Sequence, residues 1–213
     1  MQASYQFRYG VFVRMTLVTG LRLGEVVGLR WCDIDFYTNM LHVNQTLNRL
    51  QRYDDDEADS KTEIVTQTPK SQNSIRSIPM LPELVMDLQN WRTVQMQDAA
   101  AMGTSYFDSG LIATQENGLY VEPRLMREYY QKMLAAANLP NYNFHALRHT
   151  FATRAMEQGM DAKTLSILLG HYSVGFTLDT YAHVLTDQKW TAMQTMANMY
   201  NMEPPLRQPI QFF

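Results

Sequence analysis

The sequence predicts an α+β fold that is mainly α-helical and contains a small antiparallel three-stranded sheet. Two observations carry this prediction. Apolar residues with helical spacing fill the beginning and the second half of the chain, whereas β-branched and alternating stretches are confined to residues 40–78. The 213 residues, of which 46% are hydrophobic and 18% charged, have the composition of an ordinary globular protein. A single domain over residues 1–213 is therefore expected.

Two helices are expected at the start of the chain. Residues 7–17 are largely apolar and are followed by Thr19 and Gly20, where glycine stops a helix. Residues 24–29 form a second, shorter helical stretch. Arg22 therefore lies at the junction between the two helices.

Three strands are expected next, over residues 40–46, 62–66 and 74–78. Residues 35–39 and 69–73 supply the turn chemistry on either side. The strands are predicted to form one sheet, in which an acidic tip joins the first two.

The chain is expected to be helical from residue 82 onwards, apart from a short hairpin around residues 116–118. The first of these helices covers residues 82–102, and a second begins at Pro123, because proline is tolerated in the first turn. A last helix over residues 187–200 ends before two prolines, and residues 204–213 follow it as an apolar tail.

Two shorter helices between them have recognisable ends. Asn143 and Asp161 are candidate N-caps, the first for a helix that carries His145 and Arg148. Gly170 is the candidate C-cap of the helix that follows Asp161.

The net charge of -3 argues against a DNA-binding surface, because neutralising phosphates requires excess lysine and arginine. However, five of the 21 acidic residues lie within residues 54–59, so the rest of the chain carries a net +2. A mild positive balance gathered on one face suffices for contact with DNA.

The expected location is a reducing cytoplasm. Cys32 is the single cysteine, which excludes an internal disulfide and a cysteine-based zinc cluster, and it is expected in the core. The sequence contains neither an apolar run long enough to span a membrane nor a signal-peptide pattern.

His145 and Arg148 are three residues apart and thus share a face near the start of a helix, where backbone N–H groups favour an anion. A structural histidine at a helix start is the alternative. His145 and His149 also have the spacing of two zinc ligands. The zinc interpretation requires a glutamate where Ala146 stands, and no third ligand is suggested.

Arg22 follows a glycine turn that lets backbone approach a ligand closely, and its guanidinium can bind two phosphate oxygens at once. A buried pair with Glu25 is the alternative; in the phosphate-binding interpretation Arg22 points outwards. Lys70, in a turn between two predicted strands, is either a solvated charge or a proton donor. His171 is either a helix cap or a ligand-binding side chain.

Tyr181 is one of 12 tyrosines, and only its sequence context distinguishes it. A tyrosine with a pKa near 10 attacks a phosphodiester poorly unless the phosphate is neutralised. Arg22 and Arg148 would supply that neutralisation, which makes a metal ion unnecessary. The sequence also contains no phosphate-cradling G-x-x-x-x-G-K loop.

Four segments in this order resemble the catalytic signature of the tyrosine recombinases, or phage-type integrases: Thr19-Gly-Leu-Arg-Leu-Gly-Glu25, His145-Ala-Leu-Arg148, Leu169-Gly-His171 and Tyr181. The resemblance extends from Thr19 to about Val184. It identifies Arg22, Lys70, His145, Arg148, His171 and Tyr181 as catalytic and places Glu25 behind them as support. The histidine and the tyrosine are ten residues apart here, compared with nine in the family. The strand segment from Asn44 to Gln67 and the hairpin Thr68-Pro-Lys-Ser71 further resemble integrases of conjugative transposons.

The resemblance implies a recombinase catalytic domain with the DNA breaking-rejoining fold, without the upstream DNA-binding domains of a longer protein. It implies site-specific recombination of double-stranded DNA through a covalent 3′-phosphotyrosine, with Lys70 protonating the departing 5′-hydroxyl and no cofactor. The expected partners are the DNA, three further copies in a tetramer and an accessory DNA-bending or directionality factor, in a bacterial nucleoid. Residues 204–213 are expected to dock in a hydrophobic groove, on a neighbouring copy when DNA assembles the complex and in cis when the domain is alone. A non-catalytic DNA-binding or assembly module and a type IB topoisomerase are the alternatives.

Overall fold

The computed structural model describes residues 1–51, 62–67, 74–182 and 193–200. Several predictions fall outside these residues: Lys70, the acidic run 54–59, the turn 69–73, the beginning of the last helix and the tail 204–213. Of that last helix, residues 193–199 are described and are helical. None of the described helices is both long and apolar enough to cross a membrane.

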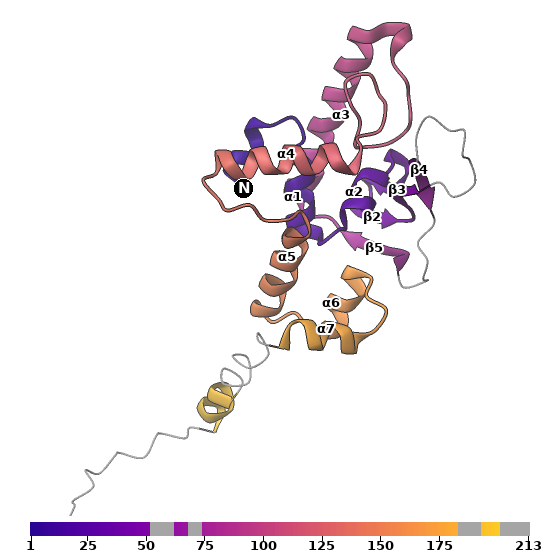
Figure 1. Ribbon diagram of the computed structural model, residues 1–213. Helices are drawn as coiled ribbons and strands as arrows, with labels where there is room; N and C mark the ends of the chain where they lie inside the picture. Colours follow the sequence, from indigo (N-terminus) through magenta and orange to yellow (C-terminus); the bar gives the residue numbers. More distant parts are fainter. Residues whose placement is uncertain (52–61, 68–73, 183–192, 201–213) are drawn as a thin grey trace, which may run out of the picture.

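The fold is mainly helical with small antiparallel sheets, as the sequence predicts (Figure 1). Helix α1 lies at its centre, with α4 across it and α3 projecting away from the sheet. Short 3-10 helices accompany the α-helices in the described part of the chain. The helices are η1 (Gln2–Gln6), α1 (Gly10–Thr19), α2 (Leu23–Gly28), η2 (Trp31–Asp33), α3 (Pro82–Met102), η4 (Gly103–Ser105), α4 (Pro123–Ala136), α5 (His145–Glu157), α6 (Ala162–Leu169) and α7 (Val174–Thr180).

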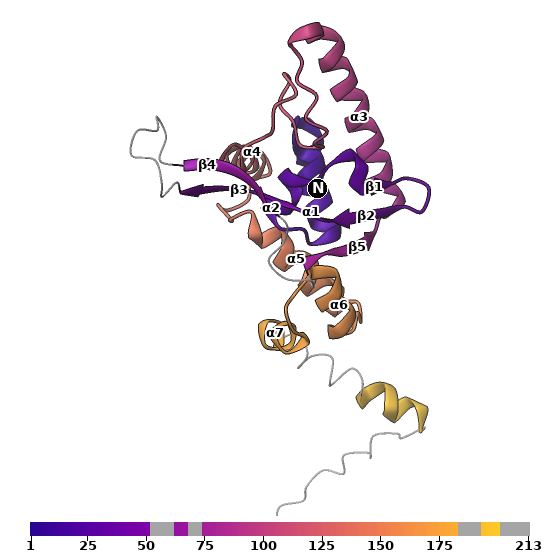
Figure 2. The same ribbon diagram turned by 90° about the vertical axis from the view of Figure 1, so that its right-hand side faces the viewer.

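The strands form two antiparallel groups instead of the single predicted sheet (Figure 2). One sheet has the order β1-β2-β5, and β3 and β4 pair separately. The strands are β1 (Ile34–Asp35), β2 (Met40–Val43), β3 (Thr46–Gln51), β4 (Thr62–Gln67) and β5 (Arg76–Pro79). The prediction of one sheet from residues 40–46, 62–66 and 74–78 was therefore wrong in its membership, although a three-stranded sheet exists.

Two polar side chains explain this difference. The Asn44 amide donates to the Asp33 carboxylate over 3.0 Å, and the Gln45 amide donates to the Gly28 carbonyl over 2.6 Å. These bonds interrupt the strand between β2 and β3, so that β3 pairs with β4 alone. Strand β1 pairs with β2 instead and completes the three-stranded sheet. The predicted turn connects β1 to β2, and in it the Asp35 carboxylate accepts from the backbone N–H groups of residues 37 and 38.

The predicted helix ends agree with the structure in several places. Helix α3 has the predicted bounds, and Asp161 caps α6 by accepting from two backbone N–H groups. Asn143 accepts from the backbone N–H of Ala146 over 3.0 Å, one residue ahead of the assigned cap of α5. The prediction that Cys32 lies in the core was wrong: Cys32 is exposed, because Asp33 takes the inward position in its 3-10 turn.

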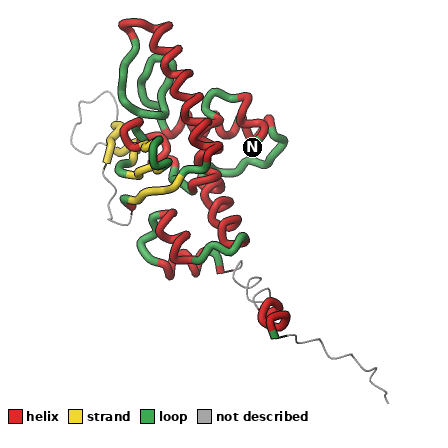
Figure 3. The backbone as a smooth tube through the Cα atoms, turned by 180° about the vertical axis from the view of Figure 1, so that it is seen from behind, coloured by secondary structure: helices red, strands yellow, loops and turns green. Residues whose placement is uncertain are grey.

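Two apolar cores meet at helix α5. The main core surrounds α1 and includes Phe144 and Leu147 at the start of α5. The smaller core lies between the end of α5 and helices α6 and α7, the pair that Figures 1 and 3 show below the main body. Gly20 lies where the cores meet, with a left-handed φ of 68°. A Cβ there would come within 2.6 Å of both Leu169 and Phe151, so only glycine fits.

Candidate active site

Two of the predicted site residues, Arg22 and Arg148, are held by backbone carbonyls at the ends of two helices. Arg148 is only 2% exposed and donates to the Gly20 carbonyl over 2.8 Å and to the Leu169 carbonyl over 2.7 Å. Arg22 donates to the Gly170 carbonyl over 3.2 Å. Because Gly20 and Gly170 are the left-handed C-caps of α1 and α6, both guanidinium groups lie at the negative ends of helix dipoles.

Glu25 and Arg76 form a buried ion pair behind the two arginines. Arg76 donates to both carboxylate oxygens of Glu25, over 3.0 and 2.9 Å, and to the Leu168 carbonyl over 2.6 Å. Burial is the largest influence on the Glu25 carboxyl and opposes its ionisation. The hydrogen bonds and charge of Arg76, together with the charge of Arg22, outweigh it and lower the pKa of Glu25. The pair thereby joins α2, β5 and α6.

The structure corrects one prediction for Arg22. Its guanidinium does not simply point outwards but also donates to the Glu25 carboxylate over 2.9 Å. The Arg22 side chain nevertheless stays 38% exposed, whereas that of Glu25 is 1% exposed. The two alternatives for Arg22, a pair with Glu25 and an outward-pointing side chain, therefore coexist. Glu25 lies between two arginines and leaves part of the Arg22 guanidinium open to solvent.

The site carries more positive than negative charge. Burial, followed by the charge of Arg22, lowers the pKa of Arg148 to about 9, and Glu25 opposes this shift. Arg148 is still positively charged at neutral pH. Three arginines, at positions 22, 76 and 148, thus share one buried carboxylate within the described residues. A site with this excess favours a bound anion.

His171 follows the cap of α6 and is buried beside the arginines. Its Nδ1 lies 2.7 Å from the hydroxyl of Thr177, and its ring contacts Phe176 edge-on. Burial, then the charge of Arg148 and of the other arginines, lowers the pKa of His171 to about 4. The ring is therefore neutral at pH 7. With Nδ1 occupied by Thr177, Nε2 is the atom left for a ligand.

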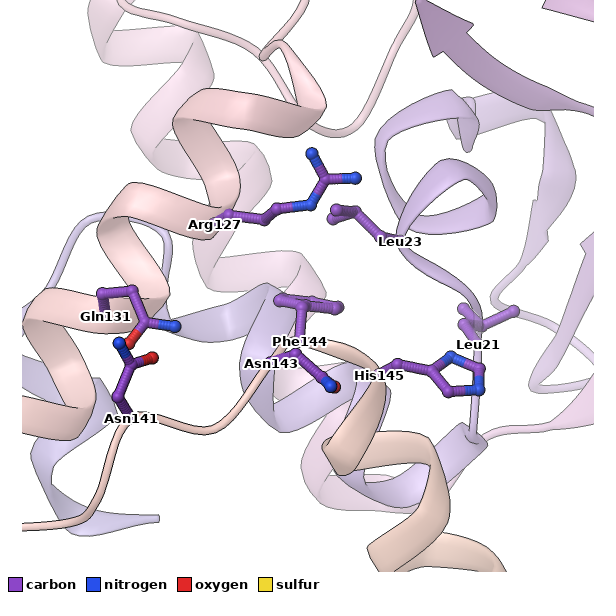
Figure 4. Close-up of a pocket in the computed structure, with 8 residues that line it drawn as sticks. All are labelled: Leu21, Leu23, Arg127, Gln131, Asn141, Asn143, Phe144 and His145. Atoms are coloured by element: carbon purple, nitrogen blue, oxygen red, sulfur yellow. The ribbon is translucent and has the colours of Figure 1, made fainter.

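His145 lies at the first turn of α5 and lines a cavity of about 590 Å³ between α4 and the loop before α2 (Figure 4). Arg127 and Gln131 from α4 line the same cavity. Burial, then the charges of His149, Arg148 and Arg22, lowers the pKa of His145. His145 therefore interacts electrostatically with Arg148 and Arg22.

Tyr181 comes directly after α7 and is 3% exposed, packed in the smaller core. Its hydroxyl lies 3.2 Å from Nδ1 of His149. Burial raises the pKa of Tyr181, and the charge of Arg148 opposes that rise. The candidate nucleophile is therefore within electrostatic range of the arginine cluster.

The structure brings together five of the six predicted site residues: Arg22, His145, Arg148, His171 and Tyr181. Lys70 lies outside the described residues. Sequence reasoning assigned no role in the site to Arg76 or Thr177 and considered His149 only as a zinc ligand. The position of His149 directly after Arg148, and that of Thr177 four residues before Tyr181, were the available signals.

His145 and His149 are the candidate zinc pair. Their rings contact each other edge-on, with centroids 4.7 Å apart. No group of three histidine, cysteine, aspartate or glutamate side chains in the described part of the chain is arranged to hold a metal ion.

Comparison with known proteins gives consistent matches over most of the chain. The model of the phage integrase family matches residues 1–188. A XerC-like tyrosine recombinase of Caldanaerobacter subterraneus subsp. tengcongensis is 35% identical over 185 residues, which cover 85% of this chain and 47% of that protein. The transposase from transposon Tn916 of Enterococcus faecalis is 26% identical over 193 residues, covering 86% of this chain and 44% of that protein. The chain thus spans about half the length of these relatives.

Among solved structures, the Tn1549 transposon integrase in complex with transposon right end DNA is similar to this chain. The TM-score is 0.71 and the sequence identity 26%, and the match covers 91% of this chain and 60% of the integrase chain.

Proposed function

The chain belongs to the phage integrase family, and on this premise we propose that it carries the catalytic site of a tyrosine recombinase acting on double-stranded DNA. The observation that carries the proposal is the arginine cluster around Arg148, which has excess positive charge beside a tyrosine hydroxyl. The DNA in the similar Tn1549 integrase complex supports a DNA substrate. Residues 1–213 would form a single catalytic domain, of which the family model matches residues 1–188.

The proposed reaction begins with the scissile phosphate beside Arg22 and Arg148. Their guanidinium groups neutralise it and stabilise the charge that develops on its non-bridging oxygens. His171 would donate a hydrogen bond from Nε2 to one of these oxygens, because Thr177 occupies Nδ1. Positive charge from three arginines makes the phosphorus accessible to a phenolic oxygen.

Tyr181 then attacks phosphorus. The new bond joins its phenolic oxygen to the 3′-phosphate, and the bond to the 5′-oxygen breaks. In our proposal Lys70 protonates that leaving oxygen. The phosphotyrosine keeps the energy of the phosphodiester, so a 5′-hydroxyl from a second strand can reverse the step and complete the exchange without a nucleotide cofactor.

We further propose assembly into a tetramer on DNA. Recombination between two duplexes requires the cutting of four strands, and each cut uses one tyrosine. An accessory DNA-bending or directionality factor belongs to the same proposal, and both rest on the family membership.

The test is covalent capture on DNA. The protein is incubated with a library of nicked duplexes whose central sequence is randomised, and adducts are separated by denaturing electrophoresis. Wild-type protein should form an adduct that Tyr181→Phe does not form, while DNA affinity stays within a few-fold. Proteolysis and mapping should find the nucleotide on Tyr181. An adduct on Tyr172 or Tyr200 contradicts the assignment.

Two further variants separate an enzyme from a non-catalytic module. Arg148→Lys cannot reproduce two directed guanidinium bonds, so we expect adduct formation to slow by roughly 10²- to 10³-fold. Arg124→Lys, on an exposed surface of α4, is the matched control and should react normally. DNA binding without any wild-type adduct favours the module instead.

A further inference from the structure

One histidine touches the hydroxyl of the proposed nucleophile, and it is not among the predicted catalytic residues. Nδ1 of His149 lies 3.2 Å from the Tyr181 oxygen, within hydrogen-bonding distance. His149 lies one position after Arg148 on α5 and is itself exposed. A proton that reaches its ring can therefore pass on to solvent.

The other two histidines of the site have different contacts. His171 binds Thr177 through Nδ1. His145 faces the cavity of Figure 4 and contacts the His149 ring edge-on, with centroids 4.7 Å apart. Within the described residues, neither has a hydrogen bond to Tyr181.

The direction of the hydrogen bond follows from the surroundings of Tyr181. Among the described residues, His149 is the hydrogen-bond partner of the buried phenol. A buried hydroxyl needs an acceptor for its proton. The bond is therefore satisfied when the tyrosine donates to Nδ1 and the ring proton of His149 is on Nε2.

We propose that His149 accepts the phenolic proton of Tyr181 during cleavage. This inference rests on the proposed function. As the phenolic oxygen attacks phosphorus, its O–H bond breaks and an N–H bond forms at Nδ1, which gives an imidazolium. The phosphorus bond to the 5′-oxygen breaks, and that oxygen takes its proton from the general acid, Lys70 in the proposed mechanism. In the reverse step His149 returns its proton to the tyrosine.

The charges around the pair are compatible with this role. From α5, Arg148 acts on Tyr181 and opposes the rise in its pKa that burial causes. Among the described residues, the rings of His145 on the same helix and of Tyr181 after α7 face His149. Arg148 would stabilise the phenolate character of Tyr181 while His149 removes the proton.

The kinetic test uses single-turnover adduct formation on a nicked duplex captured from the randomised library. His149→Gln keeps a polar side chain without a basic nitrogen, so its rate should fall on the order of 100-fold or more. Replacing Tyr181 with 3,5-difluorotyrosine gives a more acidic phenol that needs less help from a base. Two proteins that both carry difluorotyrosine are compared, one with His149→Gln and one with His149 intact. Their rates should differ by no more than about tenfold.

The matched control is His42→Gln. His42 is a histidine of β2 whose Nδ1 lies 2.8 Å from the Ser77 hydroxyl, in the sheet and outside the site. The rate of this variant should equal that of the wild type.

A measurement without DNA tests the contact itself. Nitrogen-15 NMR of the free protein should show His149 with an unprotonated Nδ1 and a protonated Nε2, and the Nδ1 resonance should move in Tyr181→Phe. The opposite tautomer, or an unmoved resonance, overturns the proposed contact whatever the protein does to DNA.

The kinetic outcomes are equally decisive. A wild-type rate in His149→Gln overturns the inference, and so does a slow rate that difluorotyrosine does not restore, because a structural defect is insensitive to phenol acidity. Failure of the wild-type protein to form any adduct overturns the proposed function as well. The two failures are thus distinguishable.

Discussion

Arg148 is a buried cation whose direct hydrogen-bond acceptors are two neutral carbonyls, those of Gly20 and Leu169. Burying a charge without an opposite charge is unfavourable, and the lowered pKa of Arg148 reflects this. Carbonyls at the C-terminal ends of α1 and α6 offset part of the cost. The remaining imbalance is what an anionic phosphate would relieve.

A pH dependence of stability follows from His171. Its pKa is about 4 in the folded protein, below the ordinary value of an unfolded histidine. Below about pH 6.5 the unfolded chain therefore takes up a proton that the folded protein does not. The contribution of His171 to the free energy of unfolding is fully present above that pH and is lost as pH falls towards 4. We expect a loss on the order of 1 to 2 kcal/mol in the free energy of unfolding, since solvent screens part of the effect. His145 acts in the same direction.

Denaturant titrations between pH 8 and pH 4 measure this loss. His171→Gln removes the titrating group and should flatten the curve while leaving the His145 contribution. Parallel curves for the variant and the wild type would mean that His171 titrates normally.

At the scale of elements, the ion pair between Glu25 and Arg76 fixes the relative positions of α2, β5 and α6. The site depends on this arrangement, because Arg22 lies at the start of α2 and His171 directly after the cap of α6. A displacement of either helix would separate Arg22 from the Gly170 carbonyl. The sheet, which lies outside the chemistry, thus positions the residues that carry it.

We predict that Arg76→Met lowers the free energy of unfolding by roughly 3 to 5 kcal/mol, because it leaves Glu25 as a buried charge without its main partner. The double variant Arg76→Met with Glu25→Leu should recover much of that loss. Arg124→Met breaks an exposed pair with Glu128 and should cost less than about 1 kcal/mol. Equal losses for the buried and exposed pairs would show that Arg76 does not anchor these elements.

At the scale of the whole molecule, charge is unevenly distributed along the chain: five of the 21 acidic residues lie within residues 54–59, which fall outside the described residues. The arginine cluster is positive, although the chain as a whole carries a net charge of -3. Binding to DNA should therefore be weak and strongly dependent on salt.

Replacing the five acids of residues 54–59 with their amides raises the net charge, and we expect tighter non-specific binding to a duplex at low salt. Fluorescence anisotropy at several salt concentrations measures both the affinity and its salt dependence. An equal number of amide substitutions at exposed acids far from the site is the control. Unchanged affinity in the 54–59 variant would place these residues away from the duplex.

The sequence by itself determined the helices and the residue types of the candidate site. The bounds of α3, the cap at Asp161 and the left-handed Gly170 follow from local spacing and backbone chemistry, which a few neighbouring residues encode. The motifs around Arg22 and Arg148 are local in the same sense, and the structure places both residues in one cluster. Their catalytic roles stay a proposal.

The tertiary structure alone decided which strands pair and which side chains complete the site. Asn44 ends a strand by binding Asp33, Arg76 pairs with Glu25 across 51 positions, and His149 meets Tyr181 across 32. Hydrogen bonds of this kind depend on where packed elements bring distant side chains. They leave no periodic pattern in the sequence, since one long-range contact specifies neither helical nor strand spacing.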